Sequence, residues 1–199
     1  GAVGIVERAV RAPAQVPSGP GRVVVSRLGQ EGERVAIQPD HADALGNRGL
    51  ALEGLGRYAE ALDSYDKALA IRPAYAEAFN NRGNALRELG RIEDALASYD
   101  SALSIRPAFA EALNNRGNVL NVLGRTGDAL AGFEQALSIR PDYAEALNNC
   151  ALALEALKRH EEALAAYDRA LALNPNYVEA LNNRSVAQSA LGRYAEALA

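Results

Sequence analysis

The most informative side chains of this sequence are pairs of asparagines, because their type and regular spacing suit them to hydrogen bonding. An Asn-Asn pair recurs four times at equal intervals, and twelve of the fourteen asparagines lie inside the first helices that the repeat described below predicts. A carboxamide donates and accepts hydrogen bonds at once, so a regular row of carboxamides can hold the peptide groups of another chain. Asparagine also costs roughly 0.5–0.7 kcal/mol relative to alanine inside a helix, so helix propensity does not explain the row.

The asparagine row belongs to a sequence repeat of fixed length, and this repeat determines the helices that carry it. Prolines recur at equal intervals, at Pro39, Pro73, Pro107, Pro141 and Pro175. The repeated units span residues 40–73, 74–107, 108–141 and 142–175, and a truncated unit spans 176–199. Places within a unit are counted from Ala42, Ala76, Ala110, Ala144 and Val178 as place 1. A fixed period of this length is typical of a solenoid.

Within each unit the apolar residues follow helical spacing on two separate stripes. A glycine such as Gly90 is placed to end the first helix in the left-handed conformation, although Lys158 replaces it in the fourth unit. The proline then ends the second helix. One helical hairpin cannot bury its stripe alone, so the hairpins must stack on one another.

The residues that recur at fixed places carry a family resemblance. Place 4 is large and apolar, places 8 and 20 are small, place 24 is aromatic, place 27 is alanine and place 32 is proline. This pattern resembles the tetratricopeptide repeat over residues 40–199. The column of asparagines at place 6 resembles that of the repeat domain of O-linked N-acetylglucosamine transferases, and NNRGN followed by LGR is similar to bacterial relatives of that domain. The resemblance implies an all-α, right-handed superhelical solenoid of antiparallel helix pairs.

The resemblance further implies that first helices line a concave groove with places 2, 5, 6, 9, 12 and 13. The candidate groove residues are therefore Asn47, Asn80, Asn81, Asn84, Asn114, Asn115, Asn118, Asn148, Asn149, Asn182, Asn183, Glu77, Glu111 and Glu145. We expect the asparagines at place 6, more than those at place 5, to bind the backbone of an extended peptide. The alternative is that they bond to the adjacent hairpin and fix only the stacking.

The function expected from these features is that of a protein-interaction scaffold. Acidic residues at place 2 favour a neutral or basic, extended protein or peptide partner, and they argue against a clamp for an acidic peptide tail. One alternative is a non-catalytic, substrate-recruiting repeat region of a larger glycosyltransferase whose catalytic part lies beyond residue 199. Another is a scaffold that assembles with itself through its uncapped ends.

Other functions find little support in the composition. Residues 40–199 hold 16 basic and 22 acidic side chains, a net charge of -6, which disfavours nucleic-acid binding. No residues are placed for catalysis, for a cofactor or for a metal ion, so we expect no enzyme activity in these 199 residues. No apolar run is long enough to cross a bilayer, which predicts no membrane span. The single Cys150 is expected to be a buried structural thiol and weakly favours a reducing, cytoplasmic location.

Arginines recur at place 7, as Arg48, Arg82, Arg116 and Arg184. Acidic residues at place 25 of the second helix recur with them, so we expect ion pairs between the two helices of a hairpin.

The N-terminal region departs from the repeat. Residues 1–30 hold three prolines and five glycines and no aromatic residue, which predicts an irregular arm. Residues 31–39 resemble the remnant of a degenerate second helix. We expect that the arm could lie in a groove of its own or of a second copy, giving a homo-oligomer through the arm or the uncapped ends.

Overall fold

The computed structural model describes residues 39–192, and these residues form helices and short turns without any strand. The helices are α1 (Pro39–Gly54), α2 (Tyr58–Ile71), α3 (Ala76–Glu88), α4 (Ile92–Ile105), α5 (Ala110–Val122), α6 (Thr126–Ile139), α7 (Ala144–Ala156), α8 (His160–Leu173) and α9 (Val178–Ala190). The predicted arm at 1–30, most of the remnant at 31–39 and the second helix expected from 193 onward lie outside the described residues. Pro39 begins α1, which suits proline because the first helical residue needs no N–H donor.

Left-handed residues turn each first helix back onto its second helix. Gly90 has a φ of 74°, and the N–H of the next residue, Arg91, donates to the carbonyl of Leu86 at 2.9 Å, which closes the end of α3. Lys158 adopts the same conformation with a φ of 64° and makes the equivalent turn after α7. The predicted turn position is confirmed, and at Lys158 it is kept in spite of a side chain that disfavours it.

An aromatic side chain packed on a small residue fills the centre of each hairpin. The rings of Tyr65, Tyr99, Phe133 and Tyr167 at place 24 are fully buried. A Cβ atom added at Gly83 would lie 2.6 Å from the ring of Tyr99, so the close approach of the two helices depends on glycine there. Burial of each such ring contributes roughly 1.5–3 kcal/mol.

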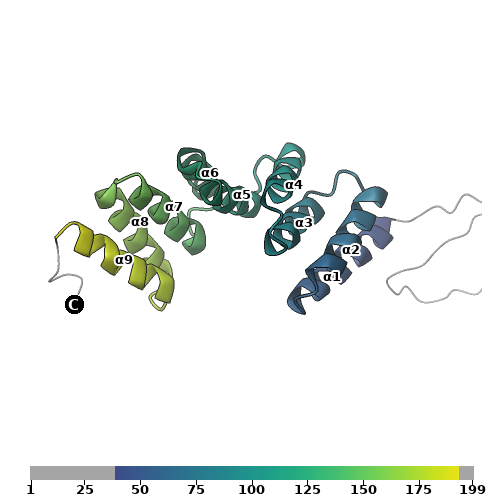
Figure 1. Ribbon diagram of the computed structural model, residues 1–199, viewed down its shortest axis with the longest axis horizontal. Helices are drawn as coiled ribbons and strands as arrows, with labels where there is room; N and C mark the ends of the chain where they lie inside the picture. Colours follow the sequence, from purple (N-terminus) through teal and green to yellow (C-terminus); the bar gives the residue numbers. More distant parts are fainter. Residues whose placement is uncertain (1–38, 193–199) are drawn as a thin grey trace, which may run out of the picture.

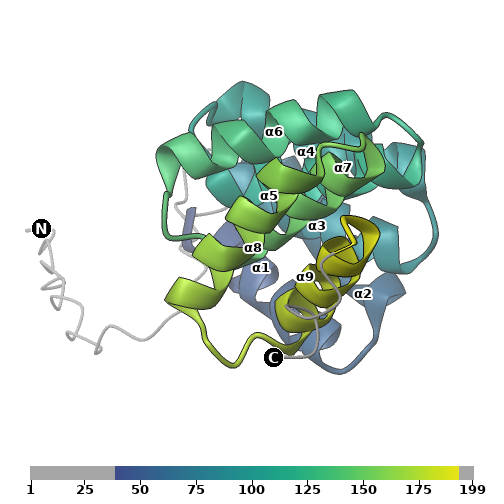
Figure 2. The ribbon, with the colours of Figure 1, turned by 90° about the vertical axis from the view of Figure 1, so that its left-hand side faces the viewer.

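The hairpins stand side by side along an arc, as Figure 1 shows from α1 and α2 at one end to α9 at the other. Seen along the long axis, successive hairpins wind around that axis (Figure 2). First helices contact the first helices of the next repeat, in the pairs α1–α3, α3–α5, α5–α7 and α7–α9, whereas no such contact joins α2, α4, α6 and α8. First helices therefore lie on the inner side of the arc. The predicted all-α repeat solenoid is confirmed.

Candidate functional site

A ladder of asparagine side chains runs along the inner side of the arc, where first helices meet. The Nδ2 group at place 6 of one repeat donates to the Oδ1 atom at place 5 of the preceding repeat. The three bonds are Asn115 to Asn80 at 3.0 Å, Asn149 to Asn114 at 3.0 Å and Asn183 to Asn148 at 3.1 Å. Each bond crosses from one repeat to the next, so the ladder ties neighbouring repeats together.

Burial separates the two rows of the ladder. The place-5 residues Asn80, Asn114 and Asn148 are buried, whereas their place-6 partners in the ladder are half-buried. The asparagines at place 5 therefore bond to the next repeat, which is the stacking role given above as the alternative to peptide binding. Place 6 keeps an open carbonyl, since the Oδ1 atoms of Asn115 and Asn149 accept no hydrogen bond from the described residues.

The amide of Asn114 shows why the ladder has one direction. Its Nδ2 group donates to the Oε1 atom of Glu145 at 2.9 Å and to the hydroxyl of Tyr143 at 3.3 Å. A carboxylate only accepts, so this partner fixes the nitrogen of Asn114 toward α7 and leaves its oxygen for the Nδ2 group of Asn149. The oxygen of Asn149 must then point away from the ladder bond.

The ladder begins at the second repeat because place 5 of the first repeat is Gly46. A Cβ atom there would lie 3.2 Å from the hydroxyl of Tyr75, so this tyrosine occupies the space of an asparagine side chain. Asn81 consequently has no partner in α1 and accepts from the Nδ2 group of Asn80 at 3.2 Å. Asn47 and Asn182 are exposed in the first and last described helices and take part in no ladder bond of the described residues.

The place-9 residues differ from repeat to repeat. Asn84 accepts a hydrogen bond from the hydroxyl of Tyr99 at 2.7 Å. Asn118 has no such partner among the described residues, because Phe133 replaces the tyrosine in its hairpin. Leu50, Leu152 and Val186 occupy the same place in the first, fourth and last units and are 47%, 41% and 67% exposed, so the row is apolar at both ends of the arc and amide in the middle.

The acidic row at place 2 is largely neutralised, which the sequence reasoning missed. Arginines at place 31 form ion pairs with the acid of their own repeat. These pairs join Arg72 to Asp43 at 2.8 Å, Arg106 to Glu77, and Arg140 to Glu111 at 2.5 Å. The signal was present in the sequence, since an arginine directly precedes the repeat proline in each of these three units.

Each of these arginines also covers an aromatic ring. The guanidinium carbons of Arg72, Arg106 and Arg140 lie 4.6, 4.5 and 3.6 Å from the ring centres of the aromatic residues three positions later. Hydrogen bonds from Arg72 hold the pKa of Asp43 below its usual value. Partial burial works to raise the pKa of Glu77, but the hydrogen bond from Arg106 and nearby charges leave it lowered. Both carboxyl groups are thus held in the charged form.

The fourth repeat breaks this pattern. Asn174 stands at place 31, so Glu145 has no arginine from its own repeat and is held instead by the amide of Asn114. Glu179, at place 2 of the last unit, has no ion pair with any described residue. The continuous acidic stripe expected from the sequence is therefore reduced to these two carboxylates at one end of the arc.

The place-7 arginines form ion pairs, but not with the partner that we expected. Arg82 donates to Asp66 at 2.6 Å, Arg116 to Asp100 at 2.6 Å and Arg184 lies 2.7 Å from Asp168. Each acid belongs to the second helix of the preceding repeat. These pairs consequently join successive repeats rather than the two helices of one hairpin.

Cys150 is buried, as expected, and burial raises the pKa of its thiol to about 11. The thiol is therefore protonated at neutral pH and is a poor nucleophile. Within residues 39–192, no cluster of three or more His, Cys, Asp or Glu side chains is arranged to hold a metal ion. The helices of the same region are all too short or too polar to cross a membrane.

Family comparisons agree with the repeat pattern. Models described as tetratricopeptide repeat match residues 42–75, 64–97, 109–176 and 166–199, and a model described as TPR repeat matches residues 83–124. Together these matches cover the chain from residue 42 to its last residue, and the chain belongs to the tetratricopeptide repeat family. None of the curated proteins compared with the sequence matches it.

Solved structures of other repeat proteins share the fold. A fragment of MamA from Desulfovibrio magneticus RS-1 is 23% identical, with a TM-score of 0.72 over 80% of this chain and 90% of that chain. PilF of Pseudomonas aeruginosa is 23% identical, with a TM-score of 0.74 over 79% and 72% of the two chains. YrrB, described as a TPR protein with an unusual peptide-binding site, is 23% identical, with a TM-score of 0.65 over 79% and 81%. At this identity the likeness concerns the fold.

Family membership supports a general role. Proteins of the tetratricopeptide repeat family commonly bind protein or peptide partners, and the fold and its neighbours support a protein-interaction scaffold.

Proposed function

We propose that this scaffold binds an extended peptide along the inner side of the arc and holds it by its backbone. The observation that carries the proposal is the open carbonyl at place 6. The ladder engages the Nδ2 groups of Asn115, Asn149 and Asn183, so their Oδ1 atoms are left to accept the N–H groups of a ligand. Place 5 then acts as a positioning residue, because it fixes the orientation of place 6.

Preorganisation is the physical advantage of this arrangement. A free asparagine must lose rotamer freedom when it binds a ligand, whereas these side chains are already held by a hydrogen bond to the neighbouring repeat. Neighbouring helical hairpins lie about 10 Å apart, and an extended peptide rises about 3.3 Å per residue. One acceptor therefore meets about every third residue of the ligand.

Side-chain preference is expected to come from the end of the arc near α7 and α9. Glu145 and Glu179 lack an arginine partner of their own repeat there, and Leu152 and Val186 are exposed in the same two helices. A ligand with a basic residue and an apolar residue at this end fits both features. Near α1, α3 and α5 the acids are paired with arginine, so a neutral segment suits that part.

Two variants that break the same ladder bond test the proposal. Random peptides displayed on phage are selected on the purified chain, and the affinity of one selected peptide is measured by fluorescence anisotropy. Asn149→Ala removes the open carbonyl, whereas Asn114→Ala breaks the same hydrogen bond from the buried side. We expect the first variant to lose about fivefold or more in affinity and the second to lose less, since a neutral hydrogen bond contributes roughly 1 kcal/mol.

Gln135→Ala, on the exposed surface of α6, serves as the control and should bind as the unchanged chain does. Equal losses in Asn149→Ala and Asn114→Ala would mean that the ladder serves stacking alone. Failure to select any peptide would contradict the proposal as a whole.

A further inference from the structure

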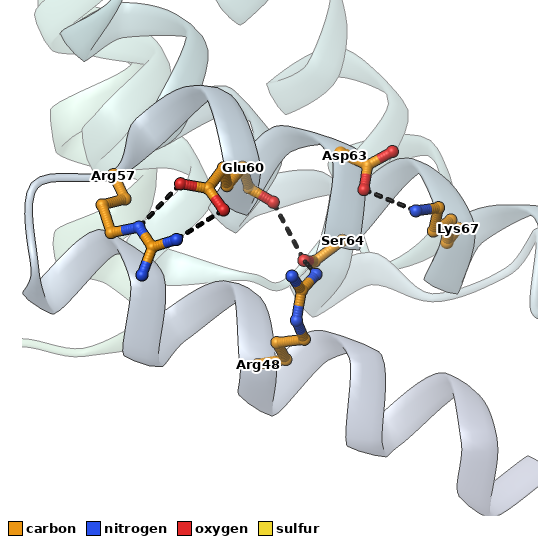
Figure 3. A network of polar contacts seen from close by, with 6 residues as sticks. All are labelled: Arg48, Arg57, Glu60, Asp63, Ser64 and Lys67. Carbon is orange, nitrogen blue, oxygen red and sulfur yellow. Dashed lines mark hydrogen bonds and ion pairs between the residues drawn. The ribbon is translucent and has the colours of Figure 1, made fainter.

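The place-7 arginines show how the space between two successive hairpins is normally filled. Arg82 reaches from α3 to Asp66 of the preceding second helix at 2.6 Å and to the hydroxyl of Ser98 in its own second helix at 2.6 Å. Figure 3 shows the equivalent contact in the first repeat, where Arg48 of α1 donates to the hydroxyl of Ser64 in α2 at 2.5 Å. The guanidinium group of Arg82 thus lies among three helices.

The fourth repeat lacks this guanidinium group and the hydroxyl that it meets. Cys150 stands at place 7, and Ala166 stands where Ser64 and Ser98 stand in earlier repeats. A cavity of about 460 Å³ that is open to the surface lies at this position, lined by residues of α6, α7 and α8 that include Cys150 and Ala166. A volume of this size falls within the range of pockets that bind small molecules.

The carboxylate that would hold the guanidinium group is nevertheless retained. Glu134 lines the cavity at place 25, where Asp66, Asp100 and Asp168 each hold an arginine. Glu134 forms no ion pair with the described residues. A second carboxylate, Glu162, also lines the cavity.

The other charged side chains that line the cavity do not all favour the binding of a cation. Glu162 is already paired with Arg159 at 2.7 Å, and Arg169 lines the cavity as well. The thiol of Cys150 is uncharged at neutral pH. Glu134 is thus the open anionic group, and Arg169 is the competing cation from within the chain.

We propose that this cavity, which we name the Cys150 cavity, receives the guanidinium group of an arginine side chain from a partner polypeptide. The choice of ligand rests on the chain itself, since every other described repeat has an arginine at place 7, where the fourth repeat has Cys150. A planar guanidinium group can donate two hydrogen bonds to one carboxylate, which an ammonium group cannot match in geometry. The cavity is lined by α6, α8 and the side of α7 that carries Cys150 and Leu154, and no asparagine of the ladder lines it.

The test uses N-acetyl-arginine amide as the probe in an NMR titration of the whole chain, with N-acetyl-lysine amide and N-acetyl-citrulline amide as comparisons. We expect saturable shifts of the amide signals of Glu134, Cys150 and Ala166, with half-saturation in the millimolar range for arginine and weaker binding of the other two probes. Shifts that fail to saturate, or equal binding of citrulline, would overturn the proposal.

Three variants test whether the probe binds in this cavity and whether a loss of binding has a cause other than misfolding. Cys150→Arg restores the arginine of the other repeats and should abolish binding while its thermal unfolding midpoint stays equal or rises. Glu134→Gln keeps the cavity and should weaken binding about tenfold. Arg169→Ser places there the residue that Ser101 provides in the second repeat, and it should bind as tightly or more tightly. Unchanged binding in Glu134→Gln, or lost binding in Arg169→Ser, would contradict the proposal.

Discussion

Removal of the Asn114 side chain measures what the ladder contributes to stability. This residue is fully buried and makes three hydrogen bonds, one from Asn149, one to Tyr143 and one to the carboxylate of Glu145. Two neutral bonds contribute about 1 kcal/mol each and the bond to the charged group contributes about 1.5–3 kcal/mol, so the gross loss is about 3.5–5 kcal/mol.

Two effects reduce this loss in Asn114→Ala. Alanine is the better helix former by about 0.5–0.7 kcal/mol, and water can replace the lost partner at Glu145, whose side chain is exposed. We therefore expect a net decrease of about 2–3 kcal/mol in the free energy of unfolding. Urea unfolding followed by circular dichroism measures it, with the slope checked because repeat arrays can unfold in parts.

Asn118→Ala is the matched control on the same helix. Asn118 is half-buried and has no hydrogen-bonded partner among the described residues, so its replacement should be neutral or stabilise by about 0.5 kcal/mol. If the two variants unfolded at the same urea concentration, the ladder would not be a stabilising element, and the preorganisation of place 6 would lose its basis.

Three further outcomes follow from single positions. Lys158→Gly relieves a left-handed residue with a φ of 64° and should raise the free energy of unfolding by about 0.5–1 kcal/mol in urea titrations; an unchanged value would contradict the strain. Gly117→Ala places a Cβ atom 2.5 Å from a buried ring and should cost about 1–3 kcal/mol, whereas Gly127→Ala meets no atom within 4 Å and should not destabilise; equal thermal midpoints would refute the close approach. The pKa of Asp43 is lowered by hydrogen bonds from Arg72, so the stability that it contributes is present at neutral pH and is lost as the pH falls through the folded pKa, which lies below the ordinary value of an aspartate. Asp43→Asn should flatten that part of the acid dependence, and an identical acid profile would contradict the pairing.

The fold could be predicted from the sequence because each repeat constrains it several times over. Helical spacing, the turn glycine and the repeat proline all require the same hairpin, and four tandem copies require that hairpins stack. The left-handed turn at Lys158 shows how strong this consensus is. One unfavourable residue does not change the turn when its neighbouring repeats fix the geometry.

The site was less predictable because its partners lie one repeat apart. The asparagine rows were evident from the sequence, and peptide binding was expected at place 6 more than at place 5. The sequence did not show the bonds between the two places, nor that place 5 is buried and place 6 half-buried in the ladder. The partner of Arg82 was also expected in the same hairpin. The pairing is set by how hairpins stack, which the pattern within one repeat does not specify.

The ion pairs of Arg72, Arg106 and Arg140 were missed for a different reason. The acids of place 2 were treated as free charges, whereas the end of the second helix brings an arginine of the same repeat back to them. The preference for a basic ligand is therefore proposed for one end of the groove only, at Glu145 and Glu179.

The most direct test of backbone capture is an N-methyl scan of a peptide selected on the chain. Each backbone N–H is replaced in turn by N–CH₃, which removes the donor and keeps the side chain, and the dissociation constant is measured by fluorescence anisotropy. Backbone capture predicts losses of about fivefold or more that recur at about every third residue, in step with the place-6 carbonyls. Uniform small losses, with binding instead governed by side-chain substitutions in the peptide, would contradict it.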